Sequence, residues 1–173
     1  MPTRRNLILS ILIAILPTLA AQAGEEPAQQ APEWKAGAAS AQITPKQPLT
    51  MSGYAARKEP AEGTEQELFA KALAIEDRDG NRVVILTMDL IGVIDRLRTA
   101  VAAEVQDKFG LPGDTLLMNA SHTHCGPAYG RDQAKDYFAE LTGILVDLVG
   151  RSLDSLKPST LTYGHARCGF AMN

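Results

Sequence analysis

The sequence has little of what would mark several specialised classes of protein. Its 17 Lys and Arg residues are outnumbered by 20 Asp and Glu, so no basic excess is present that would attract nucleic acid. There are only two cysteines, Cys125 and Cys168. In an exported protein they could form one disulfide, and a pair of free buried thiols is an equal alternative. No internal repeat is present, and no G-x-S-x-G pattern surrounds Ser121, which disfavours a serine nucleophile there.

The N-terminus predicts a secretory signal peptide. Two arginines precede the apolar run of residues 7–20, and the segment AQAG after it offers an A-x-A cleavage site at Ala23. The run is shorter than the roughly 20 residues that a membrane span needs, and Pro17 interrupts it. We therefore expect residues 1–23 to be removed from a secreted or periplasmic protein. Loss of the two arginines would change the net charge from −3 to −5.

A linker should follow the signal peptide. Residues 24–35 are rich in Glu, Gln, Pro and Ala, a composition that cannot bury enough apolar surface to fold. We expect this segment to be disordered and the folded domain to occupy residues 36–173.

A β-hairpin is predicted in the first half of this domain. Residues 67–77 and 82–92 flank Asp79-Gly80, a dipeptide typical of hairpin turns. The second segment is β-branched and almost continuously apolar, which indicates a buried central strand.

Two helices and two further strands are predicted after the hairpin. Apolar residues recur at helical spacing over residues 93–109 and 132–157, and Pro158 should stop the second helix. Residues 115–124 are typical of a buried strand, and residues 160–173 open another. The resulting β-α-β-α-β order predicts an α/β fold, with a layered, mixed and partly parallel sheet flanked by helices.

Polar side chains follow two of the predicted strands. Asp89 follows the apolar segment VVILTM, and His122 and His124 follow LLMNAS. In open α/β sheets ligands bind beyond the carboxyl ends of the strands, so these residues are the candidates for a site.

The two histidines predict a metal site. Residues two apart on a strand point to the same side, so both imidazoles could face one ion. Zinc would need three or four ligands in all. The candidates for the remaining positions are Glu65, Asp89, Cys125 and the more distant His165. The alternative is a hydrogen-bonded histidine pair that closes a strand.

Asp89 and Cys125 each have two interpretations. A carboxylate at a buried strand end needs a partner, so Asp89 is either a metal ligand or second-shell acceptor for a histidine, or a structural hydrogen-bonding group. Cys125 could be a nucleophile with a histidine as its base, but a small residue at a turn is favoured.

The domain resembles a known family in three of its segments. These are AGAASAQITP with MSGYAAR, then EGTEQELFAKALAIEDRDGNRVVILTMDLIG, and finally LLMNASHTHCGP. From about Ala36 onward the chain is similar to the N-terminal domain of neutral/alkaline non-lysosomal ceramidases. The most specific piece is the H-T-H block with its following Gly-Pro.

The resemblance implies a secreted or membrane-associated zinc amidase that cleaves the amide bond of N-acylsphingosine. It implies a zinc ligand from His122 or His124. The family usually has a further histidine ligand just before the A-K-A-L strand, where this chain has Glu65 or Gln66. The implied substrate is a lipid amide or another small amide. The resemblance also implies that the protein contacts the membrane surface.

The family's other zinc ligands, a glutamate and a tyrosine, come from further along than this sequence extends. Its nucleophilic serine belongs to an N-R-S pattern whose asparagine would match Asn173, so the serine would lie beyond that residue. We therefore expect no catalytic residue within the chain, an N-terminal domain that is incomplete at its C-terminal end, and no activity of the chain alone. The alternative is a non-catalytic secreted binding module, or a truncated relative, whose H-x-H is structural.

Overall fold

The computed structural model describes residues 33–169. The predicted signal peptide and most of the predicted linker lie outside them. The elements, in chain order, are β1 (Trp34–Gln42), β2 (Phe69–Asp77), β3 (Arg82–Met88), α1 (Asp95–Phe109), η1 (Gly113–Thr115), β4 (Leu116–Ala120), η2 (Asp132–Ala134), α2 (Lys135–Asp154) and β5 (Lys157–Ser159). No helix among the described residues is both long and apolar enough to cross a membrane.

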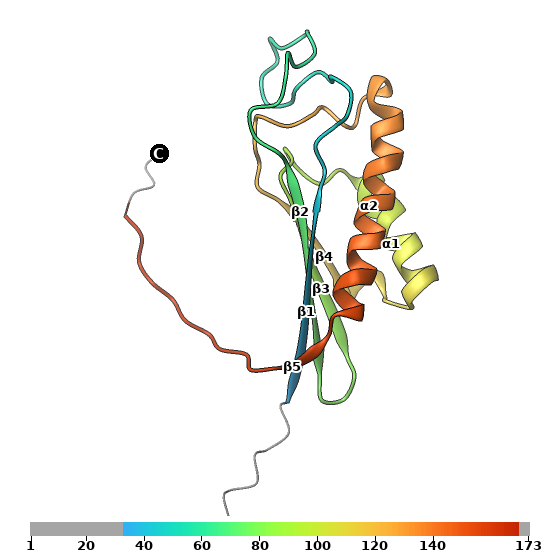
Figure 1. Ribbon diagram of the computed structural model, residues 1–173, viewed down its shortest axis with the longest axis vertical. Helices are drawn as coiled ribbons and strands as arrows, with labels where there is room; N and C mark the ends of the chain where they lie inside the picture. The colour runs from blue at the N-terminus through green and yellow to red at the C-terminus, as the bar shows by residue number, and fades with distance from the viewer. Residues whose placement is uncertain (1–32, 170–173) are drawn as a thin grey trace, which may run out of the picture. The chain divides into compact units, whose positions relative to one another are not determined.

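The five strands form one mixed sheet in the order β4-β3-β2-β1-β5. β3 and β4 are parallel, whereas the other neighbouring pairs are antiparallel. Both helices cover the same face of the sheet (Figure 1). The prediction of a layered α/β fold with a partly parallel sheet is confirmed.

The hairpin between β2 and β3 forms where Asp79-Gly80 predicted it. Asp77 closes the turn, because its Oδ1 accepts hydrogen bonds from the backbone N–H groups of Asp79 (2.9 Å) and Asn81 (2.8 Å). The side-chain amide of Asn81 also donates to this carboxylate and is the main reason that the pKa of Asp77 is lowered. Gly80 supplies the positive φ of 85° that the turn requires.

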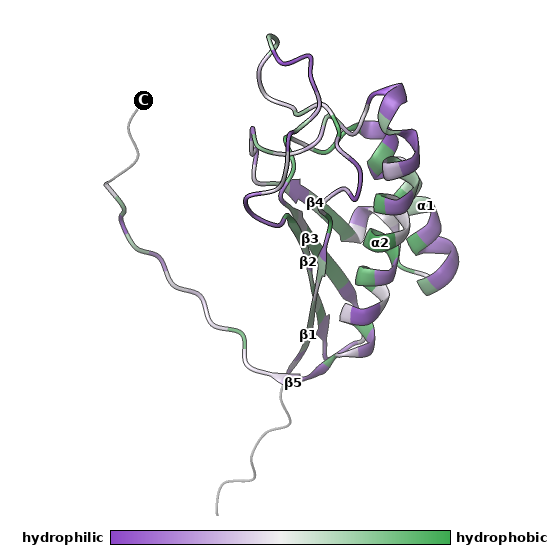
Figure 2. Cartoon of the chain, turned by 45° about the horizontal axis from the view of Figure 1, so that its top comes forward, coloured by the Kyte–Doolittle hydropathy of each residue, from purple (hydrophilic) through white to green (hydrophobic). Residues whose placement is uncertain are grey.

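The two helices supply most of the apolar layer against the sheet. α1 buries Leu97, Val101 and Val105 and ends at Phe109. Gly110 follows it with a φ of 65°, the usual left-handed conformation after a helix. α2 buries a longer stripe that includes Leu141, Leu145 and Leu148. Hydrophobic residues on both helices alternate with hydrophilic ones, as expected for helices that are half covered (Figure 2).

The chain differs from the prediction at two places near its ends. The sheet begins at Trp34 rather than at Ala36, because Trp34 pairs with both Asp77 and Ser159. α2 ends at Asp154, before Pro158, and Pro158 itself lies in the short edge strand β5. Proline has no N–H to donate to a neighbouring strand. An edge strand tolerates it because one side of the strand has no neighbour that needs this hydrogen bond.

The strand predicted from residue 160 onward does not form in the described part. Residues 160–169 have no regular secondary structure and are exposed. An alternating sequence forms a strand only where a neighbour supplies hydrogen bonds, and β5 pairs with β1 over just three residues. Residues 170–173 lie outside the described part.

The face of the sheet opposite the helices carries a row of apolar side chains. Leu73 pairs with Ile85, and Ile85 pairs with Leu117, so these three residues lie side by side across β2, β3 and β4. Leu73 is 39% exposed and Leu117 is 57% exposed. Within residues 33–169 no second layer covers this row.

Candidate functional site

The ends of β3 and β4 meet at one edge of the sheet. Met88 and Ala120 are Cα partners in this parallel pair, so the residues that follow them leave the sheet together. The backbone N–H of Ser121 donates to the carbonyl of Met88 (3.0 Å), and that of Thr123 donates to the carbonyl of Leu90 (3.2 Å). The predicted convergence of the Asp89 and histidine segments is confirmed.

The two histidines lie close together, although not for the predicted reason. β4 ends at Ala120, so His122 and His124 belong to the following loop and not to a regular strand. His122 has a φ of 58°, a left-handed conformation that is uncommon for a residue other than glycine. Their ring centroids are 5.2 Å apart. A strained backbone of this kind is frequent at functional sites.

His122 is oriented by a backbone carbonyl. Its Nδ1 lies 2.6 Å from the carbonyl oxygen of Ile91. A carbonyl oxygen only accepts hydrogen bonds, so Nδ1 must carry the proton in this contact. In the neutral imidazole the lone pair is then on Nε2, which remains available to a ligand.

His124 is held by the segment that precedes β2. Tyr54 lies edge-on to His124 with a centroid distance of 4.9 Å, and Arg57 lies 4.8 Å from the centre of the Tyr54 ring. Nη1 of Arg57 also donates to the carbonyls of Ser52 (2.8 Å) and His124. Gly53, with a φ of 100°, lies against His124 so closely that it has no room for a side chain.

Backbone hydrogen bonds join the segment around Ser52 to the loop between β4 and η2 (residues 121–131), which we call the histidine loop. The N–H of Ser52 donates to the carbonyl of Gly126 (2.8 Å), and the N–H of Ala128 donates to that of Thr50 (2.8 Å). The hydroxyl of Ser52 donates to the carbonyl of Pro127 (3.0 Å). The MSGY sequence and the H-T-H-C-G-P sequence therefore form one unit.

Tyr129 ties the histidine loop to the turn that begins α1. It is only 2% exposed. Its hydroxyl donates to the carbonyl of Gly92 (2.7 Å) and accepts from the N–H of Ile94 (3.2 Å). Burial raises the pKa of the Tyr129 phenol above its ordinary value, so it stays neutral and able to donate.

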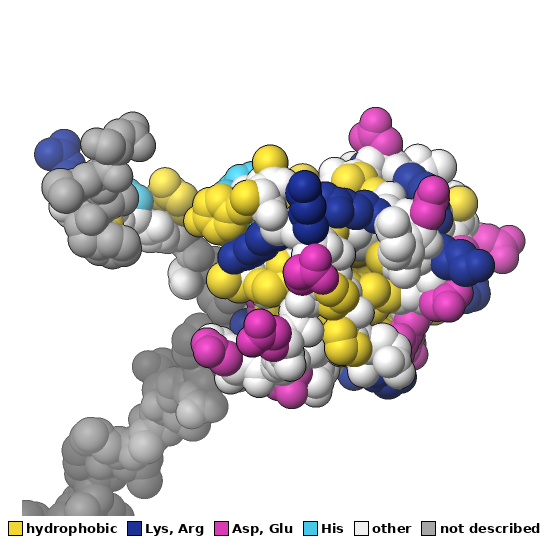
Figure 3. Space-filling view, turned by 90° about the horizontal axis from the view of Figure 1, so that it is seen from above, with side chains coloured by type: hydrophobic (Ala, Val, Ile, Leu, Met, Phe, Trp, Pro, Cys, Tyr) yellow, Lys and Arg dark blue, Asp and Glu magenta, His cyan; other side chains and the backbone are white. Residues whose placement is uncertain are grey.

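Residues of the histidine loop line two cavities. His122 and His124 line a cavity of about 550 Å³ together with Tyr54, Tyr129 and Arg131. Thr123 and Cys125 line the other cavity. Figure 3 views the molecule from above, where hydrophobic side chains gather at the surface beside Lys and Arg residues.

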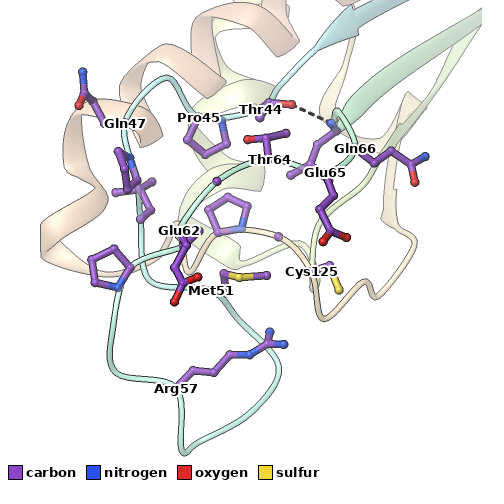
Figure 4. Close-up of a pocket in the computed structure, with 18 of the residues that line it drawn as sticks. Thr44, Pro45, Gln47, Met51, Arg57, Glu62, Thr64, Glu65, Gln66 and Cys125 are labelled. Carbon is purple, nitrogen blue, oxygen red and sulfur yellow. Dashed lines mark hydrogen bonds between the residues drawn. The ribbon is translucent and has the colours of Figure 1, made fainter.

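The second cavity has a volume of about 1300 Å³ and a mixed lining (Figure 4). Glu65, Asp89 and Cys125 line it, as do Met51 and Arg57. The structure therefore places Glu65 on a different cavity from both histidines. Among the described residues no group of three or more His, Cys, Asp or Glu side chains is arranged to hold a metal ion.

Asp89 makes a structural hydrogen bond in this arrangement. Its Oδ2 accepts from the backbone N–H of Phe69 (3.0 Å), and its own N–H donates to the Phe69 carbonyl (2.9 Å). It thereby joins the start of β2 to the end of β3. The acceptor that orients His122 is the Ile91 carbonyl, a group that side-chain patterns do not reveal.

The two cysteines and the third histidine do not line the cavity of the histidine pair. Cys125 and Cys168 are free and exposed, so the alternative of buried thiols is wrong for this structure. Among the described residues the thiol of Cys125 has no hydrogen bond to a histidine, and its N–H donates to Thr123 Oγ1 (3.1 Å). His165 is exposed in the segment after β5, near Tyr163.

The sequence profile of the neutral/alkaline non-lysosomal ceramidase N-terminal domain matches residues 34–143, which include both histidines of the loop. The chain belongs to the neutral/alkaline non-lysosomal ceramidase family. Neutral ceramidase of Drosophila melanogaster is 31% identical over 97 residues, which are 54% of this chain and 14% of that protein. Neutral ceramidase of Pseudomonas aeruginosa is 28% identical over 130 residues, which are 66% of this chain and 19% of that protein.

The fold agrees with this assignment. The crystal structure of neutral ceramidase from Pseudomonas aeruginosa matches with a TM-score of 0.65 and 23% identity, over 73% of this chain and 22% of that chain. A ceramidase complexed with C2 matches with a TM-score of 0.66. The chain thus covers less than a quarter of the length of each of these relatives.

The residues of the histidine cavity fit part of a zinc site. Histidines that bind zinc usually donate their other ring N–H to a carbonyl or carboxylate, as His122 does to Ile91. His124 adds a second imidazole beside it. A protein zinc site needs at least three protein ligands, and the described residues bring only these two together.

Proposed function

We propose that this chain is the N-terminal part of a secreted, zinc-dependent amide hydrolase of the ceramidase type. Its substrate would be N-acylsphingosine or a related lipid amide, and the products sphingosine and a fatty acid. The observation that carries the proposal is the imidazole pair of His122 and His124 within the family-matched residues, at the joined ends of β3 and β4.

Each residue of the site has a defined task in this proposal. His122 would bind zinc through Nε2, because its Nδ1 is engaged by the Ile91 carbonyl, and His124 would supply the second nitrogen. When bound, zinc would polarise the amide carbonyl or lower the pKa of a water molecule. Tyr54 and Gly53 keep the His124 ring in place, and Arg57 holds the segment that carries them.

The chain alone should bind zinc weakly and should not turn over ceramide. Two imidazoles leave most of the coordination sphere to water, and Glu65 lines the neighbouring cavity. The remaining ligands and the nucleophilic serine that the resemblance implies would come from polypeptide outside these 173 residues. Zinc-dependent release of fatty acid from ceramide by the purified chain would contradict this part of the proposal.

Metal analysis tests the site directly. We expect the purified chain, dialysed against buffered zinc, to retain more metal than the variant in which both His122 and His124 are replaced by alanine. A matched control is His165→Ala, which removes an exposed histidine outside the cavity and should leave the zinc content unchanged. Equal zinc content in the wild type and the double variant would remove the site.

Secretion has its own test. If the first 23 residues are a signal peptide, expression of the whole sequence in a bacterial host should yield a periplasmic or secreted product whose N-terminal residue is Gly24. An uncleaved product that remains in the cytoplasm would contradict this assignment.

A second candidate function is a binding module in which the H-x-H is structural. It is favoured by the contacts that both rings already make, His122 with the Ile91 carbonyl and His124 with Tyr54. In that case the double alanine variant would lose thermal stability while zinc content stayed the same. The ceramidase proposal predicts a loss of zinc binding that exceeds any effect on folding.

A further inference from the structure

The turn between β3 and α1 presents one carbonyl to the histidine site. Ile91 lies in this turn, and its carbonyl oxygen is the acceptor for Nδ1 of His122. The tautomer of His122, and therefore the direction in which its free lone pair points, depends on where this carbonyl is held.

Few groups fix the part of the turn that follows Ile91. Before it, backbone hydrogen bonds hold Asp89 and Leu90 to Phe69 and Thr123. After it, the Tyr129 hydroxyl both donates to the carbonyl of Gly92 and accepts from the N–H of Ile94. The buried Tyr129 hydroxyl thus forms hydrogen bonds with two backbone groups that follow Ile91 in the chain, the Gly92 carbonyl and the Ile94 N–H.

The same phenol also belongs to the histidine loop. Tyr129 is five residues beyond His124, and the N–H of Ala128 before it is bonded to the Thr50 carbonyl. The hydroxyl therefore joins the chain that carries the imidazoles to the chain that carries their acceptor.

From this geometry we propose that Tyr129 is a positioning residue of the histidine site. Its hydroxyl holds the Gly92–Ile94 turn so that the Ile91 carbonyl keeps His122 in the Nδ1–H tautomer, with Nε2 free toward the smaller cavity. The zinc-related part of this inference rests on the proposed function, whereas the tautomer is a property of the metal-free chain.

The test is the Tyr129→Phe variant, which removes the hydroxyl and keeps the ring. Long-range ¹H–¹⁵N NMR spectra of the metal-free chain, recorded where the imidazoles are neutral, report which nitrogen of His122 is protonated. We expect the Nδ1–H form in the wild type and a mixture with the Nε2–H form in the variant. Zinc affinity, measured by competition with a chelator, should fall roughly tenfold or more, as for other losses of a group that orients a metal ligand.

Tyr137→Phe is the matched control. Tyr137 is also buried, and its hydroxyl donates to a backbone carbonyl, that of Ile43 (2.5 Å), and not to the turn that carries Ile91. Its loss should lower stability while leaving both the His122 tautomer and the zinc affinity unchanged. Equal effects of the two variants on the tautomer would overturn the positioning role.

The possible outcomes separate this inference from the proposed function. If the wild type binds no zinc, but His122 loses the Nδ1–H form in the Tyr129→Phe variant, the zinc proposal fails and the positioning role stands. If the wild type has His122 in the Nε2–H form, the positioning role is overturned, even where the variant does not fold. An unchanged tautomer in a folded Tyr129→Phe variant overturns it as well.

Discussion

Gly53 leaves no room for a side chain beside His124: a Cβ atom at position 53 would lie 2.4 Å from Cγ of that imidazole. Real Cβ atoms do not approach other atoms so closely, so any larger residue must displace the ring or the loop. Gly53 also has a φ of 100°, which L-amino acids with a side chain rarely adopt.

Replacing Gly53 by alanine should therefore disturb both folding and the site. We expect a loss of about 1–3 kcal/mol in the free energy of unfolding from backbone strain, and weaker zinc binding from the displaced imidazole. Urea denaturation and chelator competition measure the two effects. Gly63→Ala is the control, because no atom lies within 4 Å of a Cβ at that position. Similar losses in both variants would show that the contact with His124 is unimportant.

Both cysteines should react as free thiols. Cys125 lies in the loop after His124 and Cys168 in the extended segment after β5, and both are exposed. We expect two thiols per chain to react with Ellman's reagent, without denaturant, in protein purified without reductant. No reaction in the native protein, followed by two thiols after reduction, would instead indicate the disulfide.

The sheet should lose stability in acid through Glu76. Hydrogen bonds from Lys35 (2.6 Å) and then from Arg82 (2.6 Å) lower the pKa of its carboxyl below the ordinary value of 4.5. Because the folded-state pKa is lowered, this contribution is fully present above pH 4.5 and is lost as the pH falls through the folded-state value.

The measurement is the unfolding midpoint between pH 7 and pH 2.5 for the wild type and Glu76→Gln. The variant lacks the titrating group, so its midpoint should fall less steeply in acid. Glu104→Gln, in an exposed pair with Lys108, should keep the wild-type pH dependence. The same acid dependence in Glu76→Gln as in the wild type would contradict the assignment.

Leu145 should be one of the most sensitive core positions. It is fully buried on the face of α2 that covers the sheet, so Leu145→Ala removes apolar contacts and leaves a cavity. The expected cost is about 2–5 kcal/mol in the free energy of unfolding. Leu117→Ala, on the uncovered face of β4, should change it by roughly 0.5 kcal/mol or less. Comparable costs at both positions would mean that the uncovered face is buried in solution.

Local patterns were sufficient to predict most of the fold. The hairpin at Asp79-Gly80, the two helices and the common edge of Asp89 and His122 each follow from residues close in sequence or from the parallel pairing of two buried strands. The strand expected after residue 160 failed, because strand formation depends on a partner that a local pattern does not specify.

The details of the site depend on long-range contacts and could not be predicted in the same way. Tyr54 and Arg57 reach His124 across more than sixty residues of sequence, and the acceptor of His122 is a backbone carbonyl. In the sequence, Gly53 of the MSGY segment is the one residue that indicates a close approach of two chain segments there. The family resemblance implies Glu65 as a ligand from its place before β2, but Glu65 lines a different cavity from the two imidazoles.

The row of Leu73, Ile85 and Leu117 has a consequence for handling the protein. With helices on one face of the sheet and exposed apolar side chains on the other, the described domain is amphiphilic as a whole. We expect such a face to favour association with other apolar surfaces and to bind hydrophobic dyes while the protein is still folded. Dye fluorescence in thermal-shift assays will therefore start high, and circular dichroism is the better measure of its unfolding.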